Sequence, residues 1–177
     1  MRLAVGDAVV YGRHGTGRVA ARERRVVLGL EREVVVLELG HGLWVTLPIE
    51  RARERVRAVA SETEVQRVRQ MLHEDGEPSE DSWRQRLRQG QAKLASGGAL
   101  ELAEIVRDGV RHQSQASTGA VPKLSASEQN LYVQARQLLA QEIASARGLQ
   151  PVEAEAWIEE QLAPAWEGLA RSVVETA

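Results

Sequence analysis

The chain has 177 residues, of which 43% are hydrophobic, so it can fold as one domain or as two small domains with their own cores. It contains no cysteine, which excludes disulfides, thiol catalysis and cysteine-ligated zinc, and it has no apolar run of the roughly 18 residues that a membrane span requires. A protein that coats DNA along its length would carry a positive net charge, whereas this chain has a net charge of −2. Any contact with nucleic acid is therefore expected to use a local basic patch, with a protein partner that supports the binding.

The charged residues are unevenly distributed along the chain. Residues 1–60 contain 11 basic and 7 acidic groups, whereas residues 124–177 contain 3 basic and 8 acidic groups. No apolar segment follows Met1, so we expect no signal peptide, no membrane contact and a cytoplasmic location.

Residues 1–57 are expected to form a small β module. Glycines at turn positions separate short runs of β-branched residues, and Pro48, which cannot donate a ladder hydrogen bond, is expected at a strand end or a sheet edge. Four or five strands of this length predict a strongly bent sheet or a Tudor-like or SH3-like barrel. The expected strands lie within AVGDAVVYG, GTGRVAARERRVV, EVVVLEL and LWVTLPIE.

From Ser61 onward the apolar residues recur with the period of helices. Ser61 and Glu64 have the spacing of a capping box, and Ser125 and Glu128 repeat it, so a helix is expected to begin at each serine. Gly148 is expected to end the later of these two helices. The expected buried residues are Val65, Val68, Met71 and Leu72 in the first helix and Leu131, Ala135, Leu138, Leu139 and Ile143 in the later one.

Two more helices are expected between these, over about 79–94 and 99–113. Ser79 or Asp81 is the expected cap of the first, whose first turn would be rich in acid, and the glycines after Ser96 are expected to end it. In the second, the apolar residues share one face, namely Leu100, Ala103, Val106 and Val110.

Residues 114–122 consist mainly of small residues and are expected to form a connector, either a loop or a partly disordered segment. A last helix is expected to begin at Pro151 and to continue to Pro164 or a little beyond. The sequence therefore predicts an α+β protein in which an N-terminal β module, residues 1–57, precedes a C-terminal all-α bundle of about five helices, residues 61–177.

The sequence has none of the residue patterns that are typical of catalytic sites. GRHGTGRV contains glycines, but it lies between two expected strands and predicts a hairpin turn rather than a nucleotide cradle. No nucleophile elbow is present, and the four histidines lack metal-ligand spacing. We therefore expect a protein that is not an enzyme and that has no cofactor and no metal site.

Trp83 stands at an expected helix start, directly before Arg84, where a core residue would have apolar neighbours. It is either a core anchor near a domain junction or an indole that faces outward, next to positive charge. Arg84 and Arg88 are i, i+4 neighbours on one helical face, whereas Arg86 lies well round the helix. Trp157 and Trp166 lie in an acidic helix and are expected to be core anchors.

The order and wording of four segments resemble the CarD/CdnL transcription regulators of bacteria. The resemblance covers the chain from Val5 to about Gly148, and the segments are VGDAVVYGRHGTGRV, ETEVQRVRQML, SWRQRLRQGQAKLASGGALELAEIVRDG and LSASEQNLYVQARQLLAQEIA. The first module of that family is a Tudor-like fold, which is shared with transcription-repair coupling factors and which docks edge to edge on the β subunit of RNA polymerase. Its helical module reaches promoter DNA at the upstream edge of the melted bubble and stabilises the open complex.

The resemblance also implies roles for particular residues. Arg25 matches a basic residue of the polymerase contact, and the docking edge would contain Trp44, Val45 and Thr46. The family often has a basic residue where this chain has Thr46. The protein would act as a monomer, associated with the nucleoid through RNA polymerase.

Trp83 matches the family tryptophan that is wedged into the minor groove. The DNA-binding set implied around it is Arg84, Arg86, Arg88 and Lys93. The chain departs from the family where Glu128 and the next two residues replace basic ones at a helix start, with Lys123 as a nearby cation. The alternative is a protein-interaction adaptor without direct DNA contact, in which the bundle binds a second protein through its acidic final helices.

Overall fold

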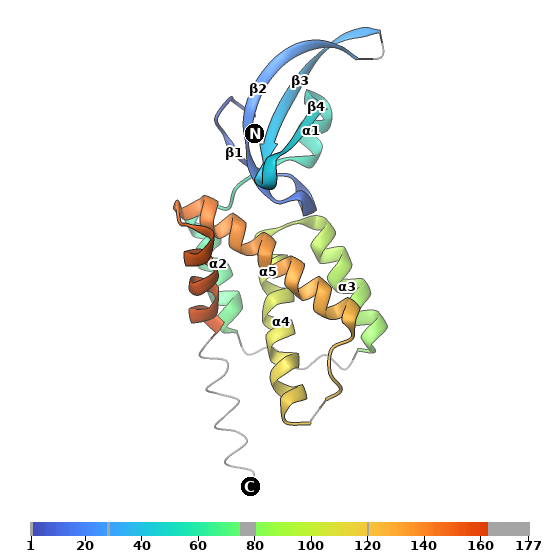
Figure 1. Cartoon of the computed structure of the whole chain (residues 1–177), viewed down its shortest axis with the longest axis vertical. Coiled ribbons are helices and arrows are strands. Elements are labelled where there is room, and N and C mark those ends of the chain that lie inside the picture. The colour runs from blue at the N-terminus through green and yellow to red at the C-terminus, as the bar shows by residue number, and fades with distance from the viewer. Residues whose placement is uncertain (1, 28, 75–80, 120, 163–177) are drawn as a thin grey trace. The chain divides into compact units, whose positions relative to one another are not determined.

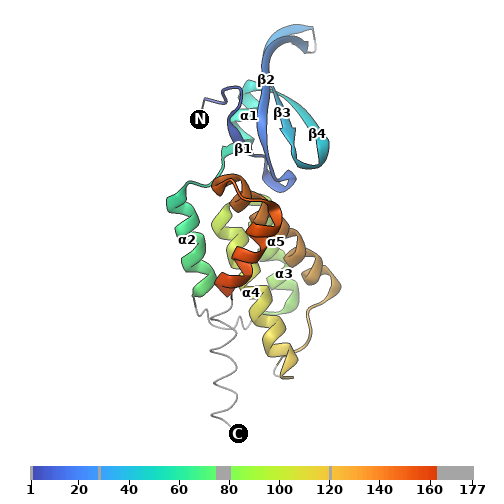
Figure 2. The ribbon, with the colours of Figure 1, turned by 60° about the vertical axis from the view of Figure 1, so that its left-hand side comes forward.

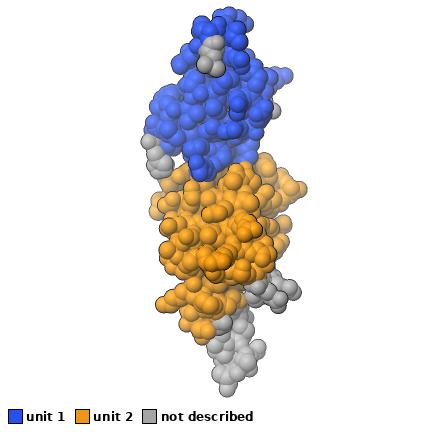
Figure 3. All heavy atoms as spheres, turned by 90° about the vertical axis from the view of Figure 1, so that its right-hand side faces the viewer, with its two compact units in different colours: residues 1–59 blue, residues 60–177 orange. Residues whose placement is uncertain are grey.

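The computed structural model describes residues 2–27, 29–74, 81–119 and 121–162. The chain divides into two compact units, Met1–Val59 and Ala60–Ala177, which Figure 3 shows in different colours. Three expectations lie outside the described residues, namely a cap at Ser79, an end of the last helix at Pro164 or beyond, and core packing of Trp166. Within those residues, no helix has the length and apolarity that a membrane crossing requires.

The N-terminal unit is an antiparallel sheet of five strands in the order β4-β3-β2-β1-β5 (Figure 1). This confirms the expected bent β module and the α+β class. The strands are β1 (Ala8–Val10), β2 (Thr16–Val27), β3 (Leu30–Leu39), β4 (Leu43–Pro48) and β5 (Arg57–Ala58).

The sheet bends because its longest pair of strands is irregular near one end. The register of β2 against β3 shifts between Val19 and Ala21, which is the signature of a β-bulge. At Gly17 the strands approach so closely that a Cβ atom would lie 2.7 Å from Cα of Leu39. Only glycine fits there, and the bend lets both ends of the sheet enclose a small core. That core contains Leu3, Val9, Val19, Val35, Leu37, Leu39, Ile49, Ala52 and Val56.

Helix α1 (Ile49–Arg55) was not expected, although Pro48 was expected to end the strand before it. The strand ends at Pro48, which becomes the residue preceding the helix. Ile49 and Ala52 are one helical turn apart and both are buried against the sheet, so tertiary packing fixes this short helix. Strand β5 has two residues and pairs with β1, and it is too short to give a sequence signal.

The second unit contains, among the described residues, five helices, as expected (Figure 2). They are α2 (Glu62–His73), α3 (Trp83–Ser96), α4 (Ala99–Ser117), α5 (Ala126–Arg147) and a helix over residues 151–162. Both expected capping boxes are present, at Ser61 and at Ser125. Gly97 and Gly148 end their helices with left-handed φ angles of 66°, as expected for C-terminal glycines.

Two boundaries differ from the expected ones. Helix α3 has Ser82 rather than Asp81 as its N-cap, and its first turn contains no acidic residue, because the acidic residues lie before the cap. Helix α4 continues to Ser117, four residues beyond its expected end, so much of the expected connector is helical. The hydroxyl of Ser117 donates to the carbonyl of Ser114 within the last turn, and Gly119, at φ +79°, follows where the helix has ended.

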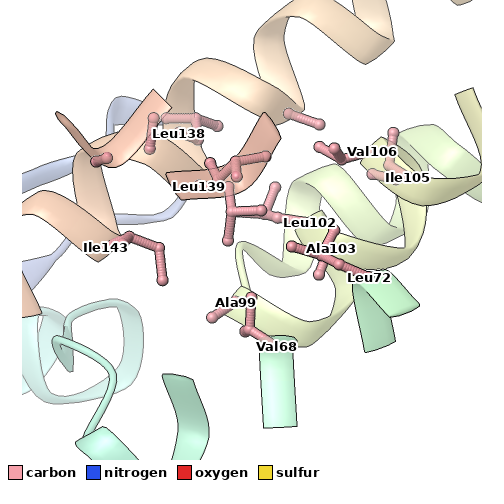
Figure 4. Packing of buried hydrophobic residues seen from close by; sticks show 14 of the residues in the cluster. Val68, Leu72, Ala99, Leu102, Ala103, Ile105, Val106, Leu138, Leu139 and Ile143 are labelled. Carbon is pink, nitrogen blue, oxygen red and sulfur yellow. The ribbon is translucent and has the colours of Figure 1, made fainter. Parts of the chain in front are cut away.

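The core of the bundle lies where α2, α4 and α5 meet, with Val68, Leu102 and Leu139 near its centre (Figure 4). Most residues expected on the apolar faces are buried, while Met71, Leu100 and Leu131 are partly buried and pack against the cluster. Each fully buried aliphatic side chain contributes about 1.5–3 kcal/mol, so this cluster fixes the helices that position the site. Trp157 is also partly buried against this core, and the Arg147 guanidinium lies 4.9 Å from its ring centre.

Candidate functional site

Strand β4 is an edge of the sheet and, within the described residues, pairs only with β3. Its outer backbone groups can therefore accept another strand. Trp44 is 58% exposed and Thr46 is also exposed, whereas Val45 packs partly buried against the core of the unit. The three residues are thus close together, but only Trp44 and Thr46 present their side chains to solvent.

Trp44 belongs to the face of the sheet that points away from the core. It lies opposite Glu38, whose carboxylate pairs with Arg18 at 2.7 Å, and Thr46 lies opposite Val36. An exposed indole beside an ion pair combines an apolar contact with a polar rim, which is the composition of many protein interfaces.

Arg25 lies on the part of the β2–β3 hairpin that continues beyond β4, as Figure 1 shows. It is opposite Arg32 in the register and pairs with Glu23 at 2.5 Å. Arg32 and Glu38 are an even number of residues apart on β3, so they lie on the same face of the sheet. Arg25 is opposite Arg32 and Trp44 is opposite Glu38, so Arg25 and Trp44 share the outer face. Arg25 lies several residue pairs further along the ribbon. The structure therefore places Arg25, Trp44 and Thr46 on one face without clustering them, whereas Val45 faces the core.

Trp83 is the first residue of α3, and its indole is 48% exposed. The guanidinium of Arg84 lies over the ring, 5.3 Å from the ring centre, which is within range of a cation–π contact. The ring is therefore not sealed inside the bundle, and of the two interpretations of its position the structure agrees with the outward one.

The four cations that follow Trp83 separate into two flanks of α3. Arg84 and Arg88 are exposed on one flank, and neither forms an ion pair with another side chain in the described part of the chain. On the other flank Arg86 pairs with Glu128 at 2.9 Å, and Lys93 pairs with Glu104 at 2.8 Å. Only the first pair of cations is fully available to a ligand.

Arg86 instead connects the start of α3 to the start of α5. One guanidinium nitrogen donates to the Asp81 carbonyl oxygen at 2.8 Å, and another donates to the Glu128 carboxylate, which is itself buried. Burial acts to raise the pKa of Glu128, but hydrogen bonds from the Ser125 backbone, the Ser125 hydroxyl and Arg86 outweigh it, so this pKa lies below its ordinary value. The ionised Arg86–Glu128 pair therefore fixes Asp81, which directly precedes Ser82 and Trp83.

A pocket with a volume of about 600 Å³ lies beside Trp83, between α3, α4 and residues 121–125. Among the residues that line it are Arg111 and Lys123, which come from different segments and were not in the expected DNA-binding set. Arg111 could not be found from the sequence, because α4 presents it to the pocket only once α3 and the connector are in place.

Two family models match the chain. The model described as "CarD, C-terminal domain" matches residues 67–159, and the one described as "CarD-like/TRCF RID domain" matches residues 3–60. A relative from Bacillus subtilis (strain 168), named "Putative transcription factor YdeB", is 25% identical over 150 residues, which cover 82% of this chain and 92% of the relative. The resemblance drawn from the four sequence segments is thereby confirmed. The chain belongs to the CarD family of transcription regulators, and its N-terminal unit is the RNA-polymerase-interacting domain that this family shares with transcription-repair coupling factors.

Proposed function

We propose that this protein binds the β subunit of RNA polymerase through the edge of its N-terminal sheet and stabilises the promoter open complex through Trp83. The observation that supports this most strongly is the half-exposed indole at the first residue of α3, with Arg84 against its ring and Arg88 one turn away. The proposal has a docking part and a DNA part, and each can be tested separately.

The docking part uses the free edge of β4. Strand addition gives affinity through main-chain hydrogen bonds and does not require a large apolar patch, which suits a module with so small a core. Trp44 and Thr46 would flank the added strand on the outer face, and Arg25 would meet an acidic group of the β subunit further along the ribbon. Val45 contributes backbone hydrogen bonds and holds the strand on the core.

The DNA part uses Trp83 as a wedge at the upstream edge of the melted bubble. An apolar side chain inserted between base steps costs least where the duplex is already bent or unstacked, so such a wedge depends on deformability more than on base identity. Arg84 and Arg88 would contact phosphates on one side of the groove. Arg86 and Lys93 would contribute mainly by fixing the helix, since each has a carboxylate partner.

A crossed pair of tryptophan variants tests both parts. We expect Trp83→Ala to lower the lifetime of promoter open complexes formed by RNA polymerase while recovery of the β subunit in a pull-down is unchanged. We expect Trp44→Ala to lower the recovery of the β subunit, and to lower open-complex lifetime only at limiting protein concentration. Both rings are about half exposed, so neither substitution should unfold the protein.

Arg25→Glu has a matched control in Arg24→Glu, because neighbouring residues of a strand point to opposite faces. Polymerase recovery should fall for Arg25→Glu alone. Equal recovery for both variants would contradict the assigned docking face. If Trp83→Ala leaves open complexes unchanged while docking persists, the DNA part is wrong and the bundle is an adaptor for another protein.

A further inference from the structure

The pocket beside Trp83 is built from parts of the chain that are far apart in the sequence. Residues of helices α3 and α4 line it together with residues 121–125 and with Leu131 and Tyr132 of α5. Its volume of about 600 Å³ lies within the range of about 300–1,000 Å³ that is typical of small-molecule sites.

The lining combines an apolar surface with an aromatic ring. Ile105, Pro122 and Leu124 face the pocket together with Trp83. Nε2 of His112 lies 2.8 Å from the carbonyl oxygen of Pro122, and this hydrogen bond holds the connector beside α4. The apolar wall is therefore fixed to the helix, and a flat ring could lie between that wall and the indole.

Two cations of the lining are not neutralised by a carboxylate. Arg111 donates one hydrogen bond to the Glu74 carbonyl oxygen, at 2.8 Å, and neither Arg111 nor Lys123 forms an ion pair within the described residues. By contrast Arg86 and Arg107 each have a carboxylate partner. Arg111 and Lys123 thus form a cationic end that can bind an anion, for which a guanidinium and an ammonium are both suited.

We propose that this pocket binds a single unpaired nucleotide, with its base against Trp83 and the apolar wall and its phosphate at Arg111 and Lys123. A nucleotide combines the two properties that the lining complements, a flat aromatic ring and an anionic group within reach of it. The nucleotide has two possible sources. The first is a melted promoter strand, which supplies unpaired nucleotides next to the Trp83 wedge, and for this source the inference rests on the proposed function. The other source is a free nucleotide in solution, which has the same chemistry.

Binding of the full chain to labelled oligonucleotides tests the proposal. A fully paired duplex is compared with a fork of the same sequence that has a single-stranded arm. Stacking of one base on an aromatic side chain corresponds to about a fivefold to 150-fold gain in affinity, so the fork should bind tighter than the duplex by this factor. In the double variant Arg111→Ala/Lys123→Ala the fork should lose that gain, while duplex binding changes by less than about threefold.

The matched control removes two cations of the same unit that do not line the pocket, by Arg67→Ala/Arg69→Ala on α2, and it should retain the preference for the fork. Amide chemical shifts of the wild-type chain give a second measurement that needs no variant. Addition of the fork should shift amides of residues 109–115 and 121–125 more than those of α2.

Thymidine and adenosine 5′-monophosphates distinguish the two sources. Shifts at the pocket with micromolar nucleotide, and no preference for the fork, would assign the pocket to free nucleotides. A preference for the fork, with free nucleotide binding only at millimolar concentration, would assign it to the melted strand. Equal binding of fork and duplex without pocket shifts from either ligand would overturn the inference. That result leaves the proposed function standing, because its DNA part is tested by the effect of Trp83→Ala on open-complex lifetime and its docking part by the recovery of polymerase.

Discussion

Gly109→Ala should destabilise the helical unit, although alanine is the better helix former. Gly109 lies within α4, where its backbone contacts the ring of Tyr132 on α5. A Cβ atom at this position would lie 3.0 Å from both Cγ and Cε2 of that ring and closer still to Cδ2. Carbon atoms in contact prefer about 3.5–4.0 Å, so the ring or the helix must move.

The ring has little freedom to move. Tyr132 is 9% exposed and belongs to the bundle core, and Arg136 lies 3.5 Å from its hydroxyl oxygen. Overpacking of this kind costs about 1–3 kcal/mol, and a rigid ring places the cost near the upper value. Alanine returns about 1 kcal/mol of helix preference, so the free energy of unfolding should fall by about 2 kcal/mol.

Urea unfolding followed by circular dichroism at 222 nm measures this change, since most of the helical residues belong to the second unit. Gly90→Ala is the control. A Cβ atom there would overlap only Cδ2 at the end of Leu131, a flexible and partly buried side chain that can rotate away. Because alanine gains the same helix preference there without a rigid neighbour, we expect this variant to be as stable as the wild type or more stable by up to about 1 kcal/mol.

A double-mutant cycle with Tyr132→Leu separates the ring contact from other effects, because the cost of Gly109→Ala should largely vanish once the ring is absent. If Gly109→Ala is as stable as the wild type, or more stable, then α4 and α5 do not approach each other as closely as the structure indicates. The reasoning from the glycine contact would then be refuted.

Three further predictions concern the cap, the ion pair and the sheet. Ser61→Ala should lower stability by about 1 kcal/mol in the same urea assay, since the hydroxyl accepts the Glu64 N–H and the capping box would be lost. Glu128→Gln should lower the free energy of unfolding by about 1 kcal/mol at pH 7. Because the pKa of Glu128 in the folded protein is lowered from 4.5, the stability advantage of the wild type is complete above pH 4.5 and should disappear as the pH falls through the folded pKa. A stability difference that is constant down to about pH 3 would contradict this. Gly17→Ala should reduce the recovery of RNA polymerase and the stability of the N-terminal sheet, since the added Cβ atom meets the backbone at Leu39. Amide chemical shifts of the sheet residues measure this change, and unaltered shifts would contradict the close strand approach.

Local signals in the sequence predicted the boundaries that depend on local chemistry. The capping boxes at Ser61 and Ser125 and the glycines after α3 and α5 each satisfy backbone groups within a few residues, so short-range patterns were enough. Helix α1 and strand β5 were missed because their stability comes from packing and pairing with distant segments. The start of α3 was placed too early because Asp81 resembles a cap but lies one residue before the residue that serves as one.

The candidate site shows the same division. The sequence singled out Trp83 and the cations after it as candidates, and the helical period correctly separated Arg84 and Arg88 from Arg86. It could not show that Arg86 and Lys93 have carboxylate partners, since Glu128 and Glu104 come from other helices. Nor could it show the pocket, because a cavity exists only where segments distant in the sequence have already packed.

The charge of the helical part limits how it could bind DNA. Residues 61–177 contain 12 basic and 18 acidic groups, so general attraction to phosphate would not hold this part on DNA. In the function proposed above, a wedge and two exposed arginines would be a weak ligand on their own. A tether to the polymerase would raise the local concentration to the millimolar range, at which such a weak contact becomes occupied. Weak intrinsic binding would therefore restrict the wedge to DNA that the polymerase has already distorted, and an acidic bundle would prevent its loss to the excess of undistorted duplex.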